Sequence, residues 1–145
     1  DTLSDTDELS PSDLSPELTK HFRGLRLWLP LKVLGLAPFR AALSEKIQLA
    51  RYFHDRVGEI AGFEIGPDPD LSVVTFRYVP ESGDPDEFNQ RLIQEIHRDG
   101  RVFLSTTQLD GRFTLRMAAV CFRTHQADID TAVEVLQEMV ERIKE

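Results

Sequence analysis

The chain has 145 residues with a 41% share of hydrophobic residues, which suits one globular domain with a packed core. Its formal net charge of −8 disfavours a nucleic-acid partner, because such a partner favours a basic face. No stretch approaches the roughly 20 apolar residues of a membrane span, and no signal-peptide pattern is present. The one cysteine, Cys121, cannot form an intramolecular disulfide. We therefore expect a cytoplasmic protein with no membrane partner, in which Cys121 is a buried structural thiol.

The N-terminal part changes character at Ser15. Residues 1–14 are acidic with little periodicity, which predicts a flexible leader. Ser15 as N-cap and Pro16 at the first helical position predict a helix that runs toward Trp28 and is broken or kinked at Pro30. The segment ends in a strongly apolar run that is too short to span a membrane. We expect 15–36 to be an interface helix and apolar segment.

The remaining residues, 37–145, predict a small α+β domain. Apolar positions at three- and four-residue spacing, Leu43 among them, predict a helix over 37–61. β-Branched and aromatic residues predict strands over 63–65 and 71–79.

The last part of this domain carries the strongest local signals. Asp84 followed by Pro85 predicts the start of a helix that ends at Gly100. An Asp-Gly pair at 110–111 predicts a hairpin of strands 102–108 and 112–120, and a last helix follows over 126–143. The resulting order predicts a small, mostly antiparallel sheet of three to four strands covered by helices.

The residues alone offer no catalytic constellation and no metal site. The four histidines lie far apart in sequence without metal-ligand spacing, and no glycine-rich phosphate loop is present. One segment differs, because Lys20, His21, Arg23 and Arg26 lie beside the apolar run. Such cations suit contact with a phosphate or carboxylate. The alternative is an interface helix whose charges pair with the acidic leader or with a partner chain.

The stretch FRGLRLWLPLKVL at 22–34 resembles a segment of the group II pyridoxal-phosphate-dependent decarboxylases, which include the aromatic-L-amino-acid, histidine and glutamate decarboxylases. Residues 46–53, 102–116 and 117–124 resemble the following helix, the hairpin and the lead into the last helix, in the same order. The resemblance runs from about Ser15 to the end. It implies the small C-terminal domain of a fold-type-I enzyme, which packs on a large domain within an obligate homodimer.

The resemblance also implies a function. The complete protein would be a carboxy-lyase acting on an L-amino acid, with aromatic amino acids favoured and glutamate and histidine open. Its pyridoxal 5'-phosphate would form a Schiff base with a lysine of the large domain in a Ser/His-Lys context. None of the lysines of this chain has that context; these lysines are Lys20, Lys32, Lys46 and Lys144. We therefore expect the chain to be inactive without its large domain.

A second residue of the family is missing as well. Its catalytic loop tyrosine has no counterpart, because no tyrosine precedes Tyr52. Decarboxylation and aldehyde formation therefore both stay open. We interpret the acidic leader as a remnant of the catalytic loop region of a longer protein.

Site residues follow from the resemblance position by position. Thr19, three residues before Phe22, matches a family position close to the substrate and cofactor of the neighbouring subunit, and Lys20 and His21 lie beside it. Structural or interface roles are implied for Arg23, Arg26, Trp28 and Arg116. The alternative to this enzyme part is a stand-alone amino-acid-binding or dimerisation module without catalysis.

Overall fold

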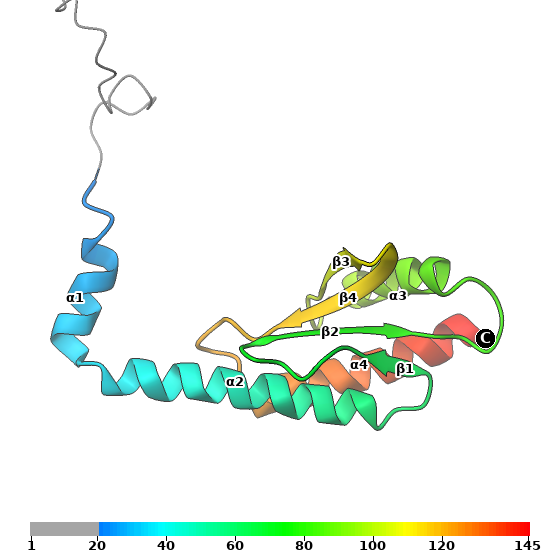
Figure 1. The fold of residues 1–145 in the computed structure, drawn as a ribbon, viewed down its shortest axis with the longest axis horizontal. Coiled ribbons are helices and arrows are strands. Elements are labelled where there is room, and N and C mark those ends of the chain that lie inside the picture. Colours follow the sequence, from blue (N-terminus) through cyan, green and yellow to red (C-terminus); the bar gives the residue numbers. More distant parts are fainter. Residues whose placement is uncertain (1–20) are drawn as a thin grey trace, which may run out of the picture. The chain divides into compact units, whose positions relative to one another are not determined.

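The computed structural model describes residues 21–145 (Figure 1). The chain divides into two compact units, one ending at Phe39 and the other running from Arg40 to Glu145. The predictions for the leader, for the helix start at Ser15 and for Thr19 and Lys20 lie outside the described residues.

The first unit contains helix α1 (Leu25–Leu34). The predicted helix toward Trp28 is wrong in its bounds, since residues 21–24 are not helical and the helix begins only at Leu25. Pro30 lies inside α1, and Gly35 ends it, with a φ of 75° and its N–H bonded to the Leu31 carbonyl at 3.0 Å. A proline within a helix removes one intrahelical hydrogen bond, here the bond to the Arg26 carbonyl. The leucines around it keep the helical preference high.

The other elements follow the predicted order. Helix α2 (Ala37–Gly58) begins at the end of the first unit and continues into the second, and it ends three residues earlier than predicted. The first strand has its predicted bounds, the second and fourth are shorter than predicted, and the third begins three residues later and ends one residue later than predicted. The remaining elements are β1 (Phe63–Ile65), β2 (Val73–Tyr78), α3 (Pro85–Asp99), β3 (Ser105–Leu109), β4 (Arg112–Ala118) and α4 (Gln126–Lys144).

The four strands form one antiparallel sheet in the order β1-β2-β4-β3. Alternate residues of β2 are buried, namely Val74, Phe76 and Tyr78. This alternation arises because successive side chains of a strand point to opposite faces of the sheet. The predicted α+β class, with a small antiparallel sheet and helices packed on it, is confirmed.

A single core fills the space between the sheet and helices α2, α3 and α4 (Figure 1). The rings of Phe53 from α2 and Phe76 from β2 meet edge to face, with centroids 5.3 Å apart. Helix α3 adds Leu92 and Ile96, both fully buried, as predicted for its inner face. Burying one such side chain contributes roughly 1.5–3 kcal/mol, so these helices hold the sheet in place.

The predicted hairpin turn is confirmed. Asp110 and Gly111 both have positive φ values, 50° and 75°, between β3 and β4. A two-residue turn with this backbone matches the right-handed twist of the two strands, and glycine adopts it without a steric penalty. The register Leu109–Arg112 closes the hairpin directly around the turn.

Two burial predictions are wrong. Cys121 is exposed, because β4 ends at Ala118 and the chain then turns, with the Thr124 amide bonded to the Cys121 carbonyl at 3.1 Å. Leu43 is exposed as well, because the buried stripe of α2 begins only at Lys46. Among the described helices, none is long and apolar enough to cross a membrane.

Candidate functional site

The predicted interface segment forms a hollow on α1. An open space of about 390 Å³ is lined by His21, Phe22, Leu25, Arg26, Leu29 and Pro30. Residues four apart on a helix lie on one face, which explains why Leu25 and Leu29 share this lining. The structure thus brings His21 and Arg26, two of the predicted site residues, to the same hollow.

Helix α1 has no buried residue. Trp28 and Val33 are more than half exposed, as are several leucines of this segment. Exposed apolar side chains in such number are more than a single soluble surface usually carries. Helix α1 thus combines exposed apolar side chains with the cations of the same segment.

Arg116 belongs to the second unit. It is exposed on β4, and its Nε donates a hydrogen bond of 3.0 Å to the hydroxyl of Ser105 on β3. The Ser105 hydroxyl donates in turn to the Arg116 carbonyl at 3.3 Å. Within this unit, Arg116 therefore links strands β3 and β4 to each other.

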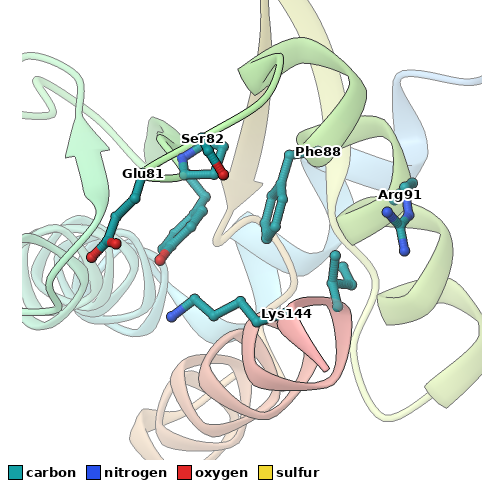
Figure 2. A pocket seen from close by; sticks show the side chains of 8 residues that line it. Glu81, Ser82, Phe88, Arg91 and Lys144 are labelled. Atoms are coloured by element: carbon teal, nitrogen blue, oxygen red, sulfur yellow. The ribbon is translucent and has the colours of Figure 1, made fainter.

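A second hollow, which sequence reasoning missed, lies where β2, α3 and α4 meet (Figure 2). Its volume is about 440 Å³, and its lining consists of Tyr78, Pro80, Glu81, Ser82, Phe88, Arg91, Ile143 and Lys144. Figure 2 shows Phe88 pointing toward Lys144, with Glu81 and Ser82 on the neighbouring loop. Two stretches far apart in sequence, 78–91 and 143–144, build this hollow, so no local sequence pattern predicts it.

Two aromatic rings and the Lys144 ammonium lie in contact within this hollow, whose lining also holds Arg91 and Glu81. Tyr78 and Phe88 stack with centroids 4.9 Å apart, and the Lys144 ammonium lies 5.4 Å from the Tyr78 ring centroid. Lys144 also donates to a Glu141 carboxylate oxygen at 2.8 Å. The Glu141 bond, with a smaller contribution from Tyr78, raises the pKa of Lys144 above its usual value. A lysine held this way stays protonated.

The described lysines do not fit a covalently bound pyridoxal phosphate. A Schiff-base lysine needs a lowered pKa and access to the cofactor, and Lys144 shows the opposite shift. Lys46 is almost fully buried, and its ammonium is held by Glu45 at 2.9 Å and by the Thr124 carbonyl. Lys32 lies on the exposed helix α1 and does not line the hollow on that helix. No cofactor chemistry is therefore assigned to the described residues.

Lys46 instead belongs to a polar link between α2 and α4. Glu45 accepts a hydrogen bond from His125 Nδ1 at 2.7 Å, and His125 caps α4, with its own backbone N–H bonded to Asp128. The His125 hydrogen bond, followed by Lys46, holds the pKa of Glu45 below its usual value. The sequence did not reveal this cap, because histidine is not a preferred N-cap residue.

No group of side chains among residues 21–145 has the arrangement of a metal site.

Comparisons with known proteins agree with this architecture. The family model described as the pyridoxal-dependent decarboxylase conserved domain matches residues 12–79. An aromatic-L-amino-acid decarboxylase from Bacillus atrophaeus is 35% identical over 92% of this chain and 27% of its own length. Tyrosine decarboxylase 2 from Arabidopsis thaliana is 32% identical over 86% of this chain and 24% of its own length.

Solved structures show the same fold. The Catharanthus roseus tryptophan decarboxylase in complex with L-tryptophan matches with a TM-score of 0.76 and 27% identity, over 83% of this chain and 26% of that one. The Oryza sativa TDC with PLP superposes with a TM-score of 0.81 over 92% of this chain and 30% of that one. The chain thus spans about a quarter of the length of the relatives it matches. It belongs to the pyridoxal-dependent decarboxylase family.

Proposed function

We propose that the chain is the C-terminal portion of a pyridoxal-phosphate-dependent carboxy-lyase that acts on aromatic L-amino acids. The observation that carries this proposal is sequence identity of 32–35% to decarboxylases named for tyrosine and for aromatic amino acids, along 86–92% of the chain. The stand-alone module is disfavoured, because a binding module of independent origin would not match one enzyme family along almost its whole length.

Activity requires the rest of the longer protein. The cofactor supplies an electron sink for the loss of the substrate carboxylate when it is bound. The described residues hold no lysine suited to it, so the lysine belongs to the large domain. This chain then contributes packing and contact surfaces.

The segment 15–36 is proposed as the contact to the large domain and to the second subunit of a homodimer. Support comes from the exposed apolar surface of α1 and from the hollow beside His21 and Arg26. Thr19, Lys20 and His21 would then lie near the substrate of the neighbouring subunit. Arg23 and Trp28 would contribute to the interface itself. A cytoplasmic location, suggested by the sequence, is part of the same proposal.

Aldehyde formation is a second candidate reaction. Phenylacetaldehyde synthases from Arabidopsis thaliana and Petunia hybrida are 30% and 31% identical to the chain. These values are close to those of the decarboxylases, so identity in this region does not separate amine from aldehyde products.

The test is a product assay on the longer protein. It is purified with pyridoxal phosphate, its visible absorbance is recorded, and L-tyrosine, L-tryptophan, L-phenylalanine and L-glutamate are supplied separately. We expect cofactor absorbance, carbon dioxide release from an aromatic substrate and the corresponding amine. Aldehyde with hydrogen peroxide would favour the second candidate, and turnover of glutamate alone would contradict the aromatic assignment. A protein without cofactor absorbance would contradict the proposal as a whole.

A further inference from the structure

The hollow around Phe88 and Lys144 combines aromatic rings with positive charge (Figure 2). Its volume of about 440 Å³ falls within the range of small-molecule sites, roughly 300–1,000 Å³. All of its lining residues lie between Tyr78 and Lys144, so they belong to the second unit. The hollow is therefore built by this unit alone.

The aromatic wall of the hollow is fixed by the core. Tyr78 is only 5% exposed, and its ring meets that of Phe63 edge to face, with centroids 5.1 Å apart. Phe88 is partly buried and stacks on Tyr78. Figure 2 shows the Phe88 ring pointing from α3 toward Lys144, so it reaches into the hollow. A planar ring that enters the hollow thus meets an aromatic surface that is already in place.

Arg91 adds a guanidinium beside this wall. It lies three residues after Phe88 on α3, so the two side chains share one face of the helix (Figure 2). Arg91 is exposed and has no ion pair or hydrogen bond with the side chains of residues 21–145, whereas Arg98 of the same helix is paired with Glu95. The planar guanidinium of Arg91 can therefore bind a carboxylate from outside through two parallel hydrogen bonds.

The surrounding charges limit what kind of anion fits. Lys144 adds a second positive charge, which its bond to Glu141 partly offsets, and Glu81 adds a negative charge to the lining. The N-terminus of α3 is already occupied, because the Asp84 carboxylate accepts a hydrogen bond from the Asp86 amide at 2.8 Å. A phosphate carries more negative charge than a carboxylate and would find no free helix terminus here. These charges favour a monocarboxylate.

We propose that this hollow binds a small aromatic carboxylate, with its ring against Phe88 and its carboxylate on Arg91. Pro80 and Ile143 complete the apolar part of the lining. The binding does not depend on the proposed function, because it uses neither a cofactor nor a reacting group. Aromatic L-amino acids belong to the same chemical class, so the second unit would recognise relatives of the proposed substrates.

Acetylation of Lys144 reports whether the hollow is occupied, since this side chain is 45% exposed without a ligand. The longer protein is treated with N-hydroxysuccinimide acetate at constant pH, and acetylation of the Lys144 peptide is followed by mass spectrometry. The ligand probe is phenylpropionate, which has no amino group and cannot form a Schiff base with pyridoxal phosphate. With about 10 mM phenylpropionate we expect acetylation to slow at least about threefold, because a site with a Kd of about 1 mM is then mostly occupied.

Controls separate binding at this hollow from other causes of protection. Propionate lacks the ring and phenylpropanol lacks the carboxylate, so neither should slow acetylation of Lys144. Arg91→Gln should abolish the protection by phenylpropionate, whereas Arg98→Gln, on the same helix but outside the lining, should retain it. The proposal would be overturned if phenylpropionate gave no protection, if either control compound protected equally, or if protection persisted in Arg91→Gln. The readout needs no turnover, so cofactor absorbance and the product assay report separately on the proposed function.

Discussion

Asn89 of α3 and Tyr78 of β2 are joined by two hydrogen bonds between a side-chain amide and a backbone amide. The Tyr78 N–H donates to Asn89 Oδ1 at 2.9 Å, and Asn89 Nδ2 donates to the Tyr78 carbonyl at 2.7 Å. Nδ2 donates also to the Pro85 carbonyl at 2.7 Å. The asparagine thereby occupies the place of a neighbouring strand at the end of β2. Because it is fully buried, water cannot replace these bonds.

We expect Asn89→Ala to lower the free energy of unfolding by about 2–4 kcal/mol, since two backbone groups of Tyr78 lose a buried partner. Asn89→Asp keeps the acceptor but removes the donor, and should also be destabilising. Gln90→Ala, at the exposed neighbouring position, should change stability by less than about 0.5 kcal/mol. Urea unfolding followed by circular dichroism measures all three. Equal stability of the Asn89 and Gln90 variants would show that the pairing is dispensable.

This pairing shows what the sequence reveals about the fold and what it does not. Phe88, Leu92 and Ile96 follow the helical period, so the inner face of α3 was predictable. The partners of Asn89 are backbone groups of a strand 11 residues away, and no sequence pattern encodes them. The order β1-β2-β4-β3 was not predicted either, because it depends on long-range pairing.

The candidate site was predictable to a smaller extent. The cationic and apolar pattern identified the segment that places His21 and Arg26 at one hollow. The hollow around Phe88 and Lys144 was missed, because it joins residues of α3 and α4 with a loop. Cys121 was wrongly expected in the core, since its apolar neighbours concealed the end of β4.

Gly62 makes room for the Tyr78 ring. A Cβ atom at residue 62 would lie 2.5 Å from the ring carbon Cε2, and the φ of Gly62 is 88°. Gly62→Ala combines backbone strain with a clash against a buried ring, so we expect a loss of about 2–4 kcal/mol. Gly83 has a similar φ of 94° with no atom within 4 Å of its Cβ, so Gly83→Ala should show the backbone cost alone, about 1 kcal/mol. Thermal unfolding of both proteins tests the difference, and equal losses would refute the clash.

Glu45 should make folding sensitive to acid. Its pKa is lowered by the hydrogen bond from His125 and by Lys46, so the folded state binds a proton less readily than the unfolded state. The stabilisation is therefore complete above the ordinary pKa of 4.5 and is lost as the pH falls through the lower folded value. We expect Glu45→Gln to unfold at lower urea than the original chain at pH 6, with the gap closing as the pH falls below 4.5. The matched variant Glu134→Gln, at an exposed position on α4, should show no such closing gap. A gap at Glu45 that stays constant from pH 6 to the acid limit would contradict the link.

Arg77 and Asp86 form an ion pair in which the arginine is the more deeply buried partner. Their closest atoms, Nη2 and Oδ1, lie 3.2 Å apart, with the side chains 11% and 34% exposed. The Nε of Arg77 is buried without a hydrogen-bond partner among the described residues, and Asp86 accepts in addition from the Phe113 amide at 3.1 Å. Asp86→Asn keeps an acceptor for Phe113 but leaves the arginine charge uncompensated.

Removal of the carboxylate should therefore cost more than removal of the guanidinium. We expect Asp86→Asn to lose about 1–3 kcal/mol, whereas Arg77→Met should be nearly neutral, because the methionine removes both the charge and the unsatisfied Nε. The double variant should be more stable than Asp86→Asn alone. Arg56→Met, which breaks an exposed pair with Glu59, serves as the control and should change stability by less than about 1 kcal/mol. If Arg77→Met lowered the free energy of unfolding more than Asp86→Asn, the prediction would be contradicted. The arginine would then stabilise the fold by itself, rather than being buried at a cost that the carboxylate offsets.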